Sequence, residues 1–138
     1  MAAPELQQTV GKVAGFTGTA LHTGEKATLK LHPAPVDHGI KFRRKDLQDE
    51  PTIDAKIENL KTVERATTIG EGSVRVHTVE HVLGALWAMG VDNAIVEMDA
   101  NEPPIGDGSA QAYVDLIHKA GEDNVTGFED VKKAYGCK

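Results

Sequence analysis

The stretch VRVHTVEHVLGAL, residues 74–86, is where the sequence changes from a strand-like to a helix-like pattern. Val74 and Val76 alternate with a polar residue, which is typical of a strand with one buried face. After them, apolar residues follow the spacing of one helical face: Val79, Val82, Leu83, Leu86 and Met89. We therefore expect a helix from about Val79 to Met89, with Thr78 as its N-cap and Gly90 as its C-cap.

Outside this stretch, a period of two in the apolar residues predicts several strands. The alternating segments are ATLKLH (27–32), GIKFRR (39–44), TIDAKIE (52–58) and NAIVEMD (93–99). The segment ATTIGEGSVRV (66–76) predicts a hairpin that turns at residues 70–72. A second helix is expected from about Ala110 to Ala120, ended by Gly121, with three apolar residues buried: Tyr113, Val114 and Ile117.

These elements together predict an α+β fold. Strands dominate and two helices punctuate them, so the natural packing is a two-layer sandwich. In this sandwich a mainly antiparallel sheet carries both helices on one face. At 138 residues the chain has the length of about one domain.

Composition argues against several classes of protein. The net charge of -6 disfavours a protein that grips the backbone of nucleic acids. The longest apolar run, at 82–91, is about half the roughly 20 residues that a membrane-spanning helix needs. The lone cysteine, Cys137, fits a reducing compartment, and the N-terminus lacks the basic start and apolar block of a secretory signal. We expect a cytoplasmic domain with no membrane span.

The core of the opening stretch, HTVEH at 77–81, has more than one chemical interpretation. Its H-x-x-E-H spacing matches inverted zinc proteases, which need both histidines on one helical face. That interpretation is disfavoured, because a cap at Thr78 leaves His77 outside the helix. Glu80 and His81 alone, in the first helical turn, could supply a base and a metal ligand. Alternatively, Glu80 only complements the helix dipole and His81 packs against the sheet.

Three segments carry a family resemblance: ALHTGEKATLKLHPAPVDHGIKFRRKDL (20–47), HTVEHVLGALWAMGVDNAIVEM (77–98) and NEPPIGDGSAQAYVDLI (101–117). Their motifs are T-V-E-H at a helix start, then D-N, then E-x-P-I-x-D-G-S-A. In this order they resemble the N-terminal domain of the UDP-3-O-acyl-N-acetylglucosamine deacetylases, the zinc amidases of bacterial lipid A synthesis. The resemblance covers roughly Thr9 to Gly121. It implies a Zn²⁺-dependent hydrolase that removes the N-acetyl group from a nucleotide-sugar lipid.

The resemblance also implies roles for individual residues. Glu80 corresponds to the family's general base, which acts on the attacking water, and His81 corresponds to a zinc ligand. His22 matches a histidine on the substrate side of the active-site mouth, although a loop residue before the turn at 23–24 is an equal alternative. His77 occupies a position that the family fills variously, often with serine, and we expect it to be a bystander.

Other matching residues are expected to support the framework of the fold. Arg43, Arg44 and Asp46 match the family, and we interpret them as structural. Glu102 and Asp107 are expected to hold the EPPIGDGSA loop in shape, with lining of the site as the alternative.

The family's fold implies a partner for this chain. Two similar α+β domains sandwich their helices between two sheets, with the zinc between the domains. The second domain brings the other zinc ligands, in an H-K-x-x-D motif. The segment HKAGED (118–123) is similar to that motif. We reject it for two reasons: the resemblance places it at the exposed end of the domain's second helix, and Gly121 is expected to break the helical register that would align His118 with Glu122.

Residues 1–121 are therefore expected to form the deacetylase-type domain. Residues 122–138 are expected to be a tail without family match, either a short terminal helix or a loosely ordered end. Completion of the site would need a second domain, a partner chain or a second copy. The alternative is a catalytically inactive homologue or fragment that acts as a binding or self-associating module through an exposed apolar helix face.

Overall fold

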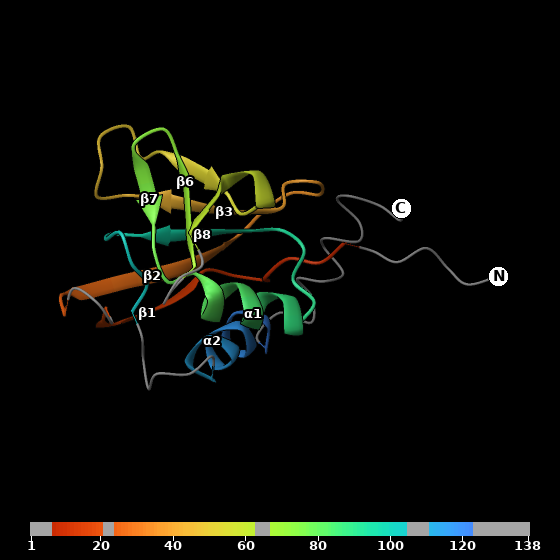
Figure 1. Cartoon of the computed structure of the whole chain (residues 1–138). Coiled ribbons are helices and arrows are strands. Elements are labelled where there is room, and N and C mark those ends of the chain that lie inside the picture. Colours follow the sequence, from red (N-terminus) through yellow and green to blue (C-terminus); the bar gives the residue numbers. More distant parts are fainter. Residues whose placement is uncertain (1–6, 21–23, 63–66, 105–110, 123–138) are drawn as a thin grey trace.

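The computed structural model describes residues 7–20, 24–62, 67–104 and 111–122, and Figure 1 shows their arrangement. The elements, in chain order, are β1 (Ala14–Thr19), β2 (Lys26–Pro33), β3 (Ile40–Arg44), β4 (Thr52–Asp54), the short helix η1 (Ile57–Asn59), β5 (Leu60–Thr62), β6 (Thr68–Glu71), β7 (Val74–Val76), α1 (Glu80–Ala88), β8 (Ala94–Met98) and α2 (Gln111–Glu122).

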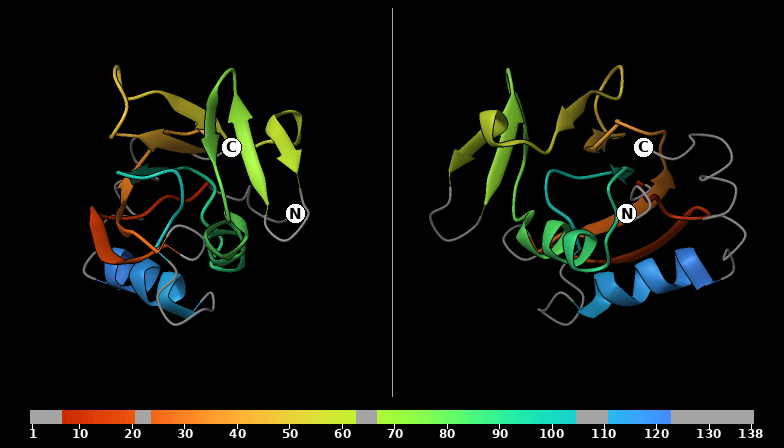
Figure 2. Two further views of the ribbon diagram at one scale, coloured as in Figure 1. Left: turned by 60° about the vertical axis from the view of Figure 1, so that its left-hand side comes forward. Right: turned by 90° about the vertical axis from the view of Figure 1, so that its right-hand side faces the viewer.

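The largest feature is a five-stranded sheet in the order β1-β2-β8-β3-β4. Its neighbouring strands are antiparallel except β3 and β8, which run parallel with Phe42 opposite Val96. The helices α1 and α2 contact each other and lie together on one side of this sheet (Figures 1 and 2). The predicted α+β sandwich, a mainly antiparallel sheet with two helices on one face, is confirmed.

The hydrophobic core lies between this sheet and the helices, because apolar residues alternate along the central strands. Leu29 and Leu31 of β2 pair with Met98 and Val96 of β8, and all of them are buried. The helices contribute their own buried residues: Val82, Ala85 and Leu86 from α1, and Tyr113, Leu116 and Ile117 from α2. The strand and helix patterns in the sequence therefore point to the same core.

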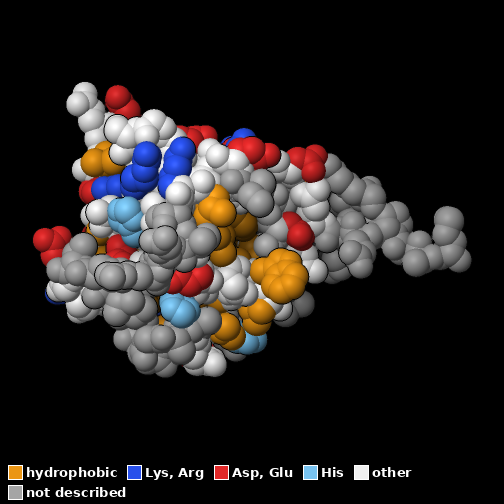
Figure 3. Space-filling view, viewed as in Figure 1, with side chains coloured by type: hydrophobic (Ala, Val, Ile, Leu, Met, Phe, Trp, Pro, Cys, Tyr) orange, Lys and Arg blue, Asp and Glu red, His pale blue; other side chains and the backbone are white. Residues whose placement is uncertain are grey.

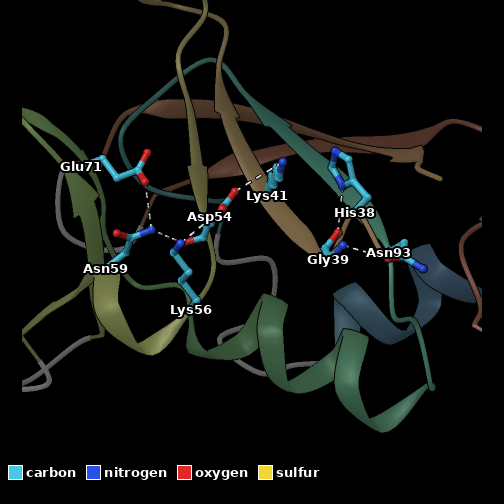
Figure 4. A network of polar contacts seen from close by, with 8 residues as sticks. All are labelled: His38, Gly39, Lys41, Asp54, Lys56, Asn59, Glu71 and Asn93. Atoms are coloured by element: carbon cyan, nitrogen blue, oxygen red, sulfur yellow. Dashed lines mark hydrogen bonds and ion pairs between the residues drawn. The ribbon is translucent and has the colours of Figure 1, made fainter. Parts of the chain in front are cut away.

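The structure also contains a second, three-stranded sheet in the order β5-β6-β7, which the predicted sandwich did not include. Its strands β6 and β7 form the predicted hairpin, but the turn lies at residues 72–73, with Glu71 paired with Val74. Asn59 joins this small sheet to the edge of the large one (Figure 4). Its Nδ2 donates to the backbone oxygen of Asp54 at 2.8 Å and to Glu71 Oε1 at 3.3 Å. The hairpin therefore has a defined position beside β4.

The ends of α1 only partly follow the prediction. The N-cap position is Val79, whose backbone is already helical and which makes no side-chain cap hydrogen bond. The prediction that Thr78 caps the helix is wrong, since Thr78 has a left-handed backbone with φ of 56°. Gly90 ends the helix as expected, one residue after the C-cap, with φ of 74°. The N–H groups of Gly90 and Val91 bind carbonyls of the last turn, at 3.1 and 2.9 Å, which makes a Schellman ending.

The helix α2 extends to Glu122, so the prediction that Gly121 ends it is wrong. The argument from Gly121 against HKAGED therefore fails, because His118 and Glu122 lie in one helix. The other argument, the exposed position, is unaffected, since His118 is exposed. Within the described residues, no helix is both long and apolar enough to span a membrane.

Candidate active site

Glu80 is the first residue of α1 and lies half-buried where the chain passes from β7 into the helix. Its Oε2 accepts a hydrogen bond from the backbone N–H of Thr67, at 3.0 Å. The carboxylate also lies at the positive end of the helix dipole, which is a favourable position for an acidic side chain. Glu80 is therefore held in place through one of its two carboxylate oxygens.

His81 follows directly and is partly exposed. Because an α-helix has about 3.6 residues per turn, the side chains of Glu80 and His81 leave the same turn in different directions. Imidazole is a common zinc ligand, and a catalytic zinc takes about three protein ligands. Among the described residues, however, no group of three or more His, Cys, Asp or Glu could hold a metal ion. This part of the chain offers one imidazole rather than a complete metal site.

His77 lies before the helix, as predicted. Its Nδ1 is 2.9 Å from Thr68 Oγ1, and its backbone N–H donates to the carbonyl of Asn101 at 2.8 Å. His77 and His81 consequently do not share a helical face. The H-x-x-E-H arrangement of inverted zinc proteases is not formed.

The turn between β7 and α1 contains a contact that sequence reasoning missed. The Oγ1 of Thr78 donates to Oε2 of Glu102 at 2.5 Å, and both side chains are buried. A threonine with φ of 56° is an outlier, because β-branched residues strongly disfavour the left-handed region. No periodicity in the sequence connects these residues, which are 24 positions apart. The only signal is the acidic residue that opens the EPPIGDGSA loop.

Glu102 is buried, with 1% of its surface exposed, at the start of that loop. Two residues further on, the carbonyl of Pro104 accepts a hydrogen bond from the Tyr113 hydroxyl of α2. Burial, and secondarily the negative charge of Glu102, raises the pKa of Tyr113. The start of the loop therefore contacts both the turn before α1 and α2.

Arg44 and Asp46 form a framework contact beside the hairpin. The Nε and Nη2 of Arg44 donate to the two carboxylate oxygens of Asp46 at 2.8 and 2.6 Å, and Nη1 donates to the carbonyl of Arg75 at 2.8 Å. The hydrogen bonds and charge of Arg44 hold the pKa of Asp46 below its usual value. Arg43 instead binds Glu97, at 3.2 Å. These contacts agree with the structural interpretation of all three residues.

The face that carries the start of α1 is mixed in character. Histidine and acidic side chains lie near the beginning of the helix, and apolar side chains are exposed over its length (Figure 3). Among the latter, Trp87 of α1 is 86% exposed. His22 and Asp107, both singled out from the sequence, lie outside the described residues.

A carboxylate beside an imidazole at a helix start, in an α+β domain, is a pair of residue types that metal-dependent hydrolases use. The chain belongs to the UDP-3-O-acyl N-acetylglycosamine deacetylase family, LpxC, whose sequence model matches residues 7–134. The resemblance seen in the sequence is thereby confirmed. The matched region also includes residues 122–134, beyond the motifs that carried the resemblance.

Two individual relatives are named UDP-3-O-acyl-N-acetylglucosamine deacetylase, and a third is named as a bifunctional enzyme. The chain is 50% identical over 115 residues to the UDP-3-O-acyl-N-acetylglucosamine deacetylase of Teredinibacter turnerae, and 49% identical over 115 residues to that of Methylococcus capsulatus. Each alignment covers 83% of this chain and 38% of the relative. The bifunctional enzyme LpxC/FabZ of Bacteroides thetaiotaomicron is 40% identical over 124 residues, 90% of this chain and 27% of that protein. The chain thus spans well under half the length of these relatives.

Proposed function

We propose that this chain forms the N-terminal part of a zinc-dependent amide hydrolase. The reaction is removal of the N-acetyl group of UDP-3-O-acyl-N-acetylglucosamine in lipid A biosynthesis. The observation that carries the proposal is the pair Glu80 and His81 at the start of α1, with Glu80 held by the Thr67 N–H. Family membership and the names of the relatives support the substrate class, a nucleotide-sugar lipid. In this proposal the deacetylase-type domain is residues 1–121, and residues 122–138 are a tail.

His81 is the proposed zinc ligand. When bound, zinc supplies Lewis acidity that polarises the amide carbonyl and lowers the pKa of water. His81 would hold it through a ring nitrogen, and its partly exposed position at the first turn of α1 suits a ligand that faces another structural unit. The remaining ligands have to come from a second domain, a partner chain or a second copy, because about three are needed.

Glu80 is the proposed general base. A base has to reach the proton that it takes, at about 2.6–3.2 Å between heavy atoms, and its carboxylate has to keep one orientation. The Thr67 N–H holds Oε2 at 3.0 Å, which directs the other oxygen, Oε1, to the attacking water. Glu80 takes the proton at Oε1 while the water oxygen bonds to the carbonyl carbon. A group from the completing half then protonates the leaving amine.

Two further residues are assigned to the substrate and the partner. His22 is proposed to lie on the substrate side of the site. Trp87 is proposed to contact the half that completes the enzyme, because a large aromatic side chain that is 86% exposed is typical of an interface.

The alternative is a catalytically inactive module that associates with itself. It is favoured by the exposure of Trp87 and by the incomplete metal set within the described residues. Sedimentation of the purified chain, combined with a zinc assay, distinguishes the two. A zinc-free oligomer supports the inactive module, and an oligomer that retains zinc supports an active assembly.

The test of the proposed activity uses a chimera in which this chain replaces the matching region of the Teredinibacter turnerae deacetylase. Glu80→Gln keeps the size of the side chain and an acceptor for Thr67 but removes the base. It is expected to lower kcat by about 100- to 10,000-fold with the zinc content unchanged. His81→Ala is expected to lower both zinc content and activity.

The matched control for this test is Glu58→Gln, an exposed glutamate of η1. This variant is expected to keep the kcat of the chimera. Parent-like deacetylation by Glu80→Gln would show that Glu80 is not the base.

A further inference from the structure

The backbone of Thr78 lies immediately before the helix that carries Glu80 and His81, and it adopts a conformation that threonine avoids. Its φ of 56° is in the left-handed region, where glycine or asparagine is the usual residue. A β-branched residue persists there only when surrounding contacts over-determine the conformation. Such contacts therefore have to be present around this turn.

One set of contacts comes from the loop after β8. The buried carboxylate of Glu102 accepts the hydrogen bond of the Thr78 hydroxyl at 2.5 Å, a short distance typical of hydrogen bonds to charged acceptors. The carbonyl of the preceding loop residue, Asn101, accepts the backbone N–H of His77 at 2.8 Å. Two consecutive loop residues thus bind two consecutive residues of the turn.

A second set of contacts with the turn comes from the residues at the start of β6. The carbonyl of Thr67 accepts the N–H of Val79 at 3.2 Å, and the N–H of Thr67 donates to Glu80 Oε2 at 3.0 Å. Thr68 contacts the ring of His77 at 2.9 Å. The turn is therefore held between two segments, and the contact with Thr67 depends on the direction in which the turn leaves Thr78.

We propose that Glu102 is a positioning residue, which fixes the left-handed conformation of Thr78 through its hydroxyl and so aims Glu80 and His81 into the reaction site. This inference rests on the proposed function of those two residues. If the Thr78 hydroxyl is lost, the turn relaxes toward negative φ. The start of α1 then rotates, and Glu80 Oε2 moves away from the Thr67 N–H. In this proposal the effect of Glu102 on the reaction is transmitted through this turn.

The test compares two substitutions of one residue in the chimera described above. Thr78→Val keeps the β-branched shape but removes the hydroxyl, and it is expected to lower kcat by about 100-fold, the effect of a displacement of about 1 Å in a reacting group. KM is expected to stay unchanged, because substrate binding does not use the turn. Thr78→Ser keeps the hydroxyl and is expected to restore kcat to within about threefold of the parent.

The matched control is Thr17→Val, which removes the hydroxyl that lies 2.8 Å from Thr28 Oγ1 on the exposed side of the large sheet. It is expected to leave kcat unchanged. In the double variant of Thr78→Val with Glu102→Ala, the loss in kcat is expected to be smaller than the product of the two single losses, because the two residues act through a shared contact.

A readout that needs no catalysis uses this chain by itself. Amide hydrogen exchange is expected to be at least about tenfold faster at Thr67 and His77 in Thr78→Val than in Thr78→Ser. Exchange at Leu29 in the core is expected to be the same in both, which excludes general unfolding.

Two results separate this inference from the proposed function. If Thr78→Val keeps parent-like kcat and parent-like exchange at Thr67, while Glu80→Gln is inactive, the role of Glu102 is wrong and the assignment of Glu80 stands. If Glu80→Gln is active, the proposed function itself fails.

Discussion

Two adjacent residues of α1 are expected to differ sharply in their contribution to stability. Leu86 is 1% exposed and Trp87 is 86% exposed. Leu86→Ala removes three buried carbons, worth about 2.4 kcal/mol at roughly 0.8 kcal/mol each. The cavity that remains increases this loss of stability, and the better helix propensity of alanine offsets a few tenths of a kcal/mol of it. We expect the free energy of unfolding to fall by about 3 kcal/mol, and Tm to fall by about 10 °C.

Trp87→Ala is the matched control, because the substitution is in the same helix but removes a side chain that already lies in solvent. Its effect is expected to stay within about 0.5 kcal/mol. Thermal and urea unfolding of both variants, followed by circular dichroism at low protein concentration, measures the difference. Equal losses in the two variants would show that α1 is not packed on the sheet through Leu86.

Two further predictions concern glycine and pH. Gly84 lies inside α1 with open space where a Cβ would be, so Gly84→Ala is expected to stabilise the chain by about 0.5–1 kcal/mol in urea unfolding. Gly90 has φ of 74°, which a side chain disfavours, so Gly90→Ala is expected to destabilise the chain by about 1–2 kcal/mol in the same assay. Opposite signs from these would refute the backbone argument. Because Arg44 lowers the pKa of Asp46, this carboxylate stabilises the fold above its unfolded pKa of about 4, and that contribution is lost as the pH falls through the lower folded value. Asp46→Asn is therefore expected to flatten the fall in stability between about pH 5 and pH 2, and Asp49→Asn, in the exposed loop, to leave it unchanged.

Most of the strands, both helices and much of their buried faces could be predicted, because each depends on local periodicity. The strands β1 and β5 were not predicted, and the strand expected over residues 52–58 ends at Asp54 and is followed by η1. The apolar spacing of α1 and the alternation of β2 and β8 are visible within single segments, and the structure confirms both. The pairing of β3 with β8 in parallel, and the separate sheet β5-β6-β7, depend on contacts between distant segments. No local pattern contains that information.

The turn before α1 shows the same limit. Glu80 and His81 could be singled out from the sequence through the T-V-E-H motif, and their chemical roles remain predictions. The left-handed conformation of Thr78 could not be predicted from the sequence, because a threonine before a helix is usually its N-cap. Here the hydroxyl binds Glu102 instead, a residue that joins the turn only in the folded chain. Similarly, Gly121 resembles a helix end, but α2 continues one residue past it, to Glu122.

The central position of β8 has a consequence for how the chain folds during synthesis. β8 pairs with β2 on one side and with β3 on the other, although the paired residues are more than 50 positions apart in the sequence. Before residues 94–98 leave the ribosome, β1-β2 and β3-β4 are two separate hairpins, each with an unpaired apolar edge. Such edges are prone to pair with other chains. The nascent domain thus depends for protection on β8, the last strand within the described residues, and a chain released before β8 is expected to aggregate.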